Sequence, residues 1–111
     1  MSHIVEIMTN GTFQLSLLVM QRYIKMTGFA NILEHDKESE ISYLETLKVF
    51  LEEGMSYTST AQKLFIHRST LIDRISRIEK ELSIDLKDSD KRLQLEILLK
   101  AIDLEKILSG K

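Results

Sequence analysis

Apolar residues recur at helical spacing along most of the chain, and this pattern predicts five to six helices. The predicted helices span residues 13–26, 29–34 and 40–53, a short helix that begins after Ser56 or Thr58, and residues 68–82 and 90–108. Thr12 and Asp88 have the residue types that favour N-caps, and Gly28 and Gly54 are placed to end the helices before them. Because the alternation typical of strands is nearly absent, the sequence predicts an all-α fold.

The helix predicted over residues 68–82 has two chemically different faces. Leu71, Ile75, Ile78 and Leu82 recur at i, i+4, i+7 and i+11 and form one apolar stripe, while the opposite face carries small polar and basic side chains. A short helix that ends near Leu64 precedes it, so the two form a helix-turn-helix. An apolar back for the core and a polar, basic front for DNA are what a recognition helix requires.

The polar front and its flanks supply the candidate DNA contacts. Ser69, Thr70 and Asp73 are the candidates for base edges, and Lys63, Arg68, Arg74 and Arg77 are the candidates for phosphate. His67, which lies just before the helix, either caps it or touches phosphate. The alternative for the basic residues is an ordinary solvated helix face, but their clustering opposite an apolar stripe favours DNA.

The last predicted helix carries apolar residues on two sides. One stripe consists of Leu93, Ile97, Ala101, Leu104 and Leu108, and the other of Leu95, Leu98, Leu99 and Ile102. One stripe is expected to pack on the helix-turn-helix core, which leaves the other without a partner. Since the helix over residues 13–26 is also apolar nearly all round between Leu15 and Met20, we expect the two spare surfaces to pack on each other or to form a homodimer interface, the dimer being favoured.

Charge is unevenly distributed along the chain. The net charge is −2, which by itself argues mildly against a nucleic-acid partner. Residues 61–80, however, hold five cations against two acids, a net of +3, whereas residues 34–53 hold seven acids against two lysines, a net of −5. The basic charge is therefore concentrated on the predicted recognition helix.

Other function classes find no support in the residues. The 111-residue chain has no cysteine, and its three histidines are isolated from one another, so neither a metal nor another cofactor is predicted. It lacks a nucleophile elbow, a P-loop and any other catalytic constellation, so it is not expected to be an enzyme. The apolar run at residues 13–20 is too short to span a membrane, and the chain is expected in the cytoplasm.

From about Ile32 to Ile107 the chain resembles the C-terminal helix-turn-helix domain of the PucR/CdaR family of bacterial transcription regulators. The landmarks in order are LEHD at 33–36, YLETL at 43–47, Glu53-Gly54, Thr60-Ala61, LFIHRSTL at 64–71, Arg74, RIEKEL at 77–82, DLKD at 85–88 and RLQLEILL at 92–99. The resemblance implies binding to double-stranded promoter DNA, with any effector, such as a sugar diacid or a purine-derived metabolite, bound by upstream domains absent here.

Two residues depart from the family pattern. Asp73 stands where the family usually has an aromatic residue, and Ser69 stands where it often has asparagine. A carboxylate at position 73 repels phosphate but can accept a hydrogen bond from a cytosine amino group, so the base preference is expected to differ from that of relatives.

Two domains and two functions follow as expectations. Residues 1–36 are interpreted as an N-terminal helical segment, a linker or remnant that offers a dimer surface, and residues 37–111 as the helix-turn-helix domain. The expected function is sequence-specific DNA binding by the helix over 68–82. The alternative is a helical module that only dimerises or binds another protein.

Overall fold

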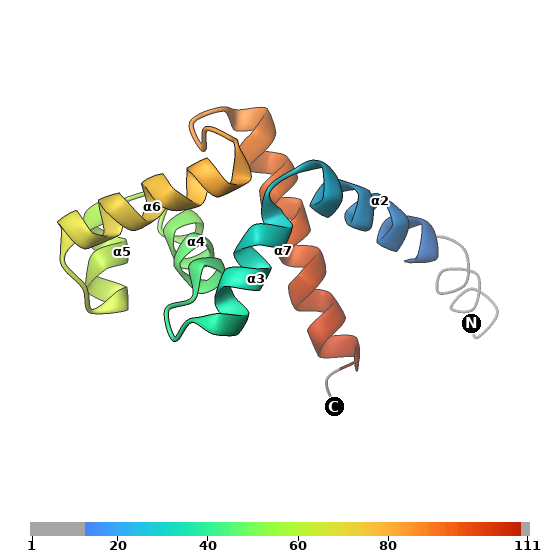
Figure 1. The fold of residues 1–111 in the computed structure, drawn as a ribbon, viewed down its shortest axis with the longest axis horizontal. Helices are drawn as coiled ribbons and strands as arrows, with labels where there is room; N and C mark the ends of the chain where they lie inside the picture. The colour runs from blue at the N-terminus through green and yellow to red at the C-terminus, as the bar shows by residue number, and fades with distance from the viewer. Residues whose placement is uncertain (1–12, 110–111) are drawn as a thin grey trace.

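The computed structural model describes residues 13–109, and within them all side chains except those of residues 13–17, 20, 26 and 109. This part of the chain is all helical, as predicted (Figure 1). Its helices are α2 (Phe13–Met26), α3 (Phe29–Glu38), α4 (Tyr43–Glu52), α5 (Tyr57–Leu64), α6 (Arg68–Leu82) and α7 (Ser89–Ser109). The predicted cap at Thr12 lies outside the described residues.

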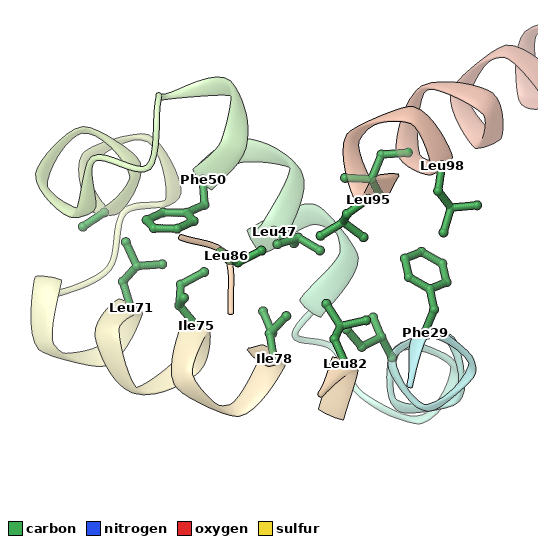
Figure 2. Packing of buried hydrophobic residues seen from close by; sticks show 13 residues of the cluster. Phe29, Leu47, Phe50, Leu71, Ile75, Ile78, Leu82, Leu86, Leu95 and Leu98 are labelled. Atoms are coloured by element: carbon green, nitrogen blue, oxygen red, sulfur yellow. The ribbon is translucent and has the colours of Figure 1, made fainter. Parts of the chain in front are cut away.

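One hydrophobic core joins α3, α4, α5, α6 and α7. The predicted stripe of α6 forms one side of it, and all four of its residues are buried. Figure 2 shows this row facing Leu47 and Phe50 of α4 and Leu95 of α7, with Phe29 of α3 pointing toward Leu98. The back of the recognition helix is therefore fixed in the core, and its opposite face is directed outward.

Several predicted boundaries are confirmed. The helices α2 and α6 have the predicted bounds, and Ser56 is the residue that caps α5, where its hydroxyl accepts from the Ser59 N–H at 3.2 Å. Asp88 precedes α7, and its carboxylate accepts from the backbone N–H groups of Asp90 at 3.1 Å and Lys91 at 3.3 Å. Caps of this kind satisfy donors that have no partner within the helix.

Two predicted boundaries are wrong. The helix α3 continues to Glu38 rather than ending near Glu34, and α4 begins at Tyr43 rather than near residue 40. Ile41, which the predicted helix over residues 40–53 included, lies before α4 and is exposed. The physical reason is the cap at Ser42, whose hydroxyl accepts from the Glu45 N–H at 3.0 Å and fixes the start of the helix after Ile41.

Asp36 joins the end of α3 to the start of α4. Its carboxylate accepts from the N–H groups of Tyr43 at 2.7 Å and Leu44 at 3.0 Å, and from the Ser42 hydroxyl at 2.9 Å. His35 Nδ1 lies 2.9 Å from the same carboxylate, and the His35 ring stacks on Tyr43. An acid at a helix N-terminus is stabilised by the free N–H groups and by the helix dipole.

The glycines at 28 and 54 end helices for different reasons. Gly54 has φ of 64°, the left-handed conformation of a residue that follows a helix C-terminus, as predicted. Gly28 has an ordinary φ of −79°. A Cβ added at Gly28 would collide with the backbone carbonyl of Glu81, so glycine is needed there because α6 passes so closely.

The two stripes of α7 have different environments. Leu95, Leu98 and Leu99 are buried in the core, and Ile102 packs against it, which confirms that one stripe covers the helix-turn-helix. The other stripe is exposed at Leu93, Ile97, Leu104 and Leu108. On α2, which packs on α3 and extends away from the body in Figure 1, Leu18 and Val19 are exposed as well. Among the described side chains, the exposed apolar residues of α2 and α7 do not cover each other.

Candidate nucleic-acid interface

The turn between α5 and α6 fixes the start of the recognition helix. Phe65 adopts the left-handed conformation, with φ of 56° and ψ of 43°, and its side chain is 94% exposed. Its N–H donates to the Gln62 carbonyl at 3.3 Å, and the Ile66 N–H donates to the Ala61 carbonyl at 3.0 Å. This closes α5 and turns the chain sharply into α6, although a left-handed phenylalanine costs about 1 kcal/mol relative to glycine.

The predicted contact residues lie together on the outer side of this helix-turn-helix. Its exposed members are Lys63, His67, Arg68, Ser69, Thr70, Asp73 and Arg77, and only Arg74 is half-buried. His67 has the extended backbone of an N-cap residue, but its side chain makes no capping hydrogen bond. The first turn of α6 therefore keeps N–H groups that no side chain caps, next to an exposed imidazole and guanidinium.

Arg68 is held at the start of α6 by an aromatic ring. Its guanidinium carbon lies 5.7 Å from the centroid of the Tyr57 ring, within the range of a cation–π contact. Tyr57 in turn packs against the buried ring of Phe50, with centroids 5.0 Å apart. The contact orients the guanidinium while leaving it exposed, which lowers the entropy lost when it binds an anion.

Arg74 faces the body of the domain more than the other candidates do. Its Nη1 donates to Oγ1 of Thr46 on α4 at 3.3 Å, and that buried hydroxyl itself donates to the Ser42 carbonyl at 2.8 Å. Arg74 therefore ties the recognition helix to α4. The rest of its planar guanidinium still has donors for a second partner.

Two candidate cations already have acidic partners. The Nε of Arg77 lies 3.1 Å from the Asp73 carboxylate one turn earlier, and the Nζ of Lys63 lies 2.9 Å from that of Glu53. Glu53, as a hydrogen-bond partner and as a charge, raises the pKa of Lys63 above its ordinary 10.5. Both pairs are largely exposed at the basic residue, so each is weak and can exchange for phosphate at little cost.

A mixed-charge cleft of about 320 Å³ borders the C-terminal half of α6. Its lining comes from α3, α4 and α6 and consists of Asn31, Glu34, His35, Glu38, Tyr43, Arg77, Lys80 and Glu81. Three carboxylates beside this half of the helix oppose a DNA phosphate chain. The N-terminal half, from Arg68 to Asp73, does not line this cleft and is the half that helix-turn-helix proteins insert into the major groove.

The sequence did not indicate the contacts that orient these side chains. The Arg68–Tyr57 and Arg74–Thr46 contacts join residues that are 11 and 28 positions apart, so no helical periodicity relates them. The Asp73–Arg77 pair is different, because its i,i+4 spacing is visible in the sequence.

Within the described residues, no group of three or more His, Cys, Asp or Glu side chains is arranged to hold a metal ion. In the same part of the chain, none of the helices combines the length and apolarity needed to cross a bilayer.

Comparison with known proteins places this geometry in a family. The family model for the PucR C-terminal helix-turn-helix domain matches residues 43–101, which is more than half of the chain. The matched region begins with α4 and includes α5, all of α6 and most of α7.

Three curated proteins of Bacillus subtilis (strain 168) are similar to this chain. The Purine catabolism regulatory protein is 34% identical over 68 residues, which cover 61% of this chain and 13% of that protein. The Proline-responsive transcriptional activator PutR is 42% identical over 60 residues, covering 54% and 15%. The DNA-binding transcriptional activator AdeR is 28% identical over 109 residues, covering 92% and 26%. The matched part of the chain thus spans between 13 and 26% of these relatives, and no solved structure matches it.

Proposed function

Because this chain belongs to the PucR C-terminal helix-turn-helix family, a family of DNA-binding domains of transcriptional regulators, we propose that it docks on promoter DNA through the N-terminal half of α6. The observation that carries the proposal is the division of α6 into a buried apolar back and an exposed polar front. In the major groove such a helix places short polar side chains against base edges, while flanking cations bind phosphate.

The exposed residues divide into two roles. Ser69, Thr70 and Asp73 lie on the front of the helix and are proposed to contact base edges. Lys63, His67, Arg68, Arg74 and Arg77 are proposed to bind phosphate, with Arg68 as the best placed because Tyr57 orients it and no carboxylate among the described residues pairs with it. Asp73 both holds Arg77 and presents an acceptor, so its proposed preference is for cytosine.

Arg68→Ala tests the phosphate role. It is expected to weaken binding to every duplex by a similar factor, and to reduce the slope of log affinity against log salt by about one unit, because one fewer counterion is released. The measurement is a salt titration of duplex binding by fluorescence anisotropy. Lys106→Ala, which removes a cation from the exposed end of α7, is the matched control and is expected to leave the slope unchanged.

If Arg68→Ala keeps both the affinity and the salt slope of the parent chain, the proposed docking of α6 is wrong. If instead it alters base preference without altering the slope, Arg68 contacts a base edge rather than phosphate.

We also propose the oligomeric state, the location and the role of this domain. It acts as a homodimer in the cytoplasm, has a binding role and no catalytic one, and leaves any effector to regions outside the helix-turn-helix. Support comes from the exposed apolar surfaces on α2 and α7, and from relatives roughly four to five times longer, whose names include a response to proline and the control of purine catabolism. The interaction-module alternative gains no support from the comparisons, since PutR and AdeR are named as transcriptional activators.

A further inference from the structure

The exposed stripe of α7 is a long apolar surface without a partner among the described residues. Leu93, Ile97, Leu104 and Leu108 are each between 53 and 60% exposed, and Ala101 lies between them on the same side of the helix. Single exposed leucines are ordinary, but a row of four over four turns marks an interaction surface.

The last turns of α7 also project from the body of the domain (Figure 1). Asp103 ties α7 to the body through a 3.0 Å ion pair between its carboxylate and Nζ of Lys48 on α4. All residues from 104 to 108 are exposed. Because short helical segments are marginal in water without tertiary packing, this end of α7 is expected to be covered by something else.

The stripe is symmetric about its own centre. Leu93 and Leu108 lie equally far from the point between residues 100 and 101, and so do Ile97 and Leu104. Two copies of α7 that run antiparallel about a two-fold axis at this point therefore bring Leu93 against Leu108 of the partner subunit, and Ile97 against Leu104 of the partner subunit. A two-fold interface needs this self-complementarity, and a small residue near the axis lets two helices approach closely.

We propose that α7 forms an antiparallel two-fold interface with a second copy of this chain, centred between Lys100 and Ala101. The pairing covers the projecting end of each α7 with the start of the partner's α7, which lies on the partner's body. The proposal deepens the homodimer of the proposed function by naming its surface. In Figure 1 the N-terminal end of α6 lies at the left edge of the view and the end of α7 at its lower middle, so the pairing is expected to leave the proposed DNA-binding face uncovered.

The oligomeric state of the full chain tests the surface. We expect a dimer by sedimentation or light scattering at about 100 µM, and a monomer for Ile97→Glu, because a carboxylate would be buried at the interface. Lys106→Glu is the matched control: it places an acid on the opposite side of the same helix and is expected to stay dimeric. Far-ultraviolet circular dichroism shows whether each variant keeps its helices. A monomeric parent chain, or a dimeric and folded Ile97→Glu, overturns the proposal.

Single cysteines test the orientation, since the chain has none of its own. Ala101→Cys is expected to form a disulfide-linked dimer on mild oxidation. Leu93→Cys and Leu108→Cys are expected to cross-link when mixed but not each with itself, and Lys106→Cys is the control that should not cross-link. Cross-linking of Leu93→Cys with itself would indicate parallel helices and contradict the antiparallel arrangement.

Failure of this interface and failure of DNA binding give different results. If only the interface is wrong, Ile97→Glu binds an inverted repeat and a single half-site with the same affinities as the parent chain. If the interface is right, Ile97→Glu keeps its affinity for a single half-site. Its affinity for the inverted repeat falls at least tenfold, because binding to the second half-site is no longer linked to binding to the first. If no duplex is bound while Ile97→Glu still dissociates the dimer, the proposed function fails and the interface stands.

Discussion

Gly28 is required by a close steric contact and Gly54 by its backbone conformation, and alanine substitutions distinguish the two. Gly28→Ala places a methyl group against the Glu81 carbonyl, so α2 and α3 must shift away from α6, and we expect a loss of about 3 kcal/mol in the free energy of unfolding. Gly54→Ala meets no atom within 4 Å but must keep a φ of 64°, and it is expected to lose about 1 kcal/mol. Urea denaturation of both variants measures the difference.

If the free energy of unfolding of Gly28→Ala lies within about 0.5 kcal/mol of that of the parent chain, the close approach of residue 28 to α6 does not constrain this position. Gly54→Ala serves as the control here, because it changes the same residue type at a helix end with open space around it.

The roles of single residues at the interface were only partly predictable. The front of α6 followed from its period, since a buried stripe at i, i+4, i+7 and i+11 fixes the opposite face. The inward turn of Arg74 could not be predicted, because it depends on Thr46, a residue of another helix whose position is set by tertiary packing.

At the scale of elements, the Asp36 network is expected to make the α3–α4 corner sensitive to acid. Partial burial by itself would raise the pKa of Asp36, but hydrogen bonds from His35, Leu44, Tyr43 and Ser42 outweigh it and lower the pKa below 3.8. Since the folded pKa lies below the unfolded one, the network stabilises the domain fully above the unfolded value. This stabilisation is lost as the pH falls from about 3.8 through the folded pKa.

Asp36→Ala should therefore cost about 1–2 kcal/mol at pH 7, and less as the pH falls below 4. The measurement is urea denaturation at several pH values between 7 and 3, with Glu38→Ala, an exposed acid of the same helix, as the control. A cost that does not change with pH would mean that the carboxylate charge at Asp36 is not what stabilises the corner.

Helix boundaries were predictable where a local signal sets them. Residues 68–82 and 13–26 are bounded by turn and breaker residues, and their predicted limits match the structure. The C-terminal half of α3 was missed because FANILEHDKE ends in a charged run without apolar periodicity, and this run is tied to α4 through Asp36. Long-range ties of this kind leave no pattern in the local sequence.

At the scale of the whole molecule, the sequence predicted two apolar stripes on α7 but could not say which one is buried. Both stripes consist mainly of leucine and isoleucine, and only one includes an alanine, so composition does not distinguish the buried stripe from the exposed one. The position of α7 on α3 and α4 decides the question, with Leu95 against the core and Ile97 in solvent. The same placement puts the N-terminal end of α6, which is proposed to bind DNA, and the proposed dimer helix on different parts of the domain (Figure 1).

The proposed role of α6 is to select a DNA sequence through its exposed front. The most direct test is selection of bound duplexes from a random library by the 111-residue chain, repeated with Asp73→Ala. We expect one motif to be enriched, present as an inverted repeat if the chain dimerises, and we expect Asp73→Ala to change the preferred base at one position of each half-site. Docking through α6 would be contradicted if no motif is enriched at low salt. It would also be contradicted if Asp73→Ala leaves the enriched motif unchanged and Arg68→Ala leaves the affinity for that motif unchanged.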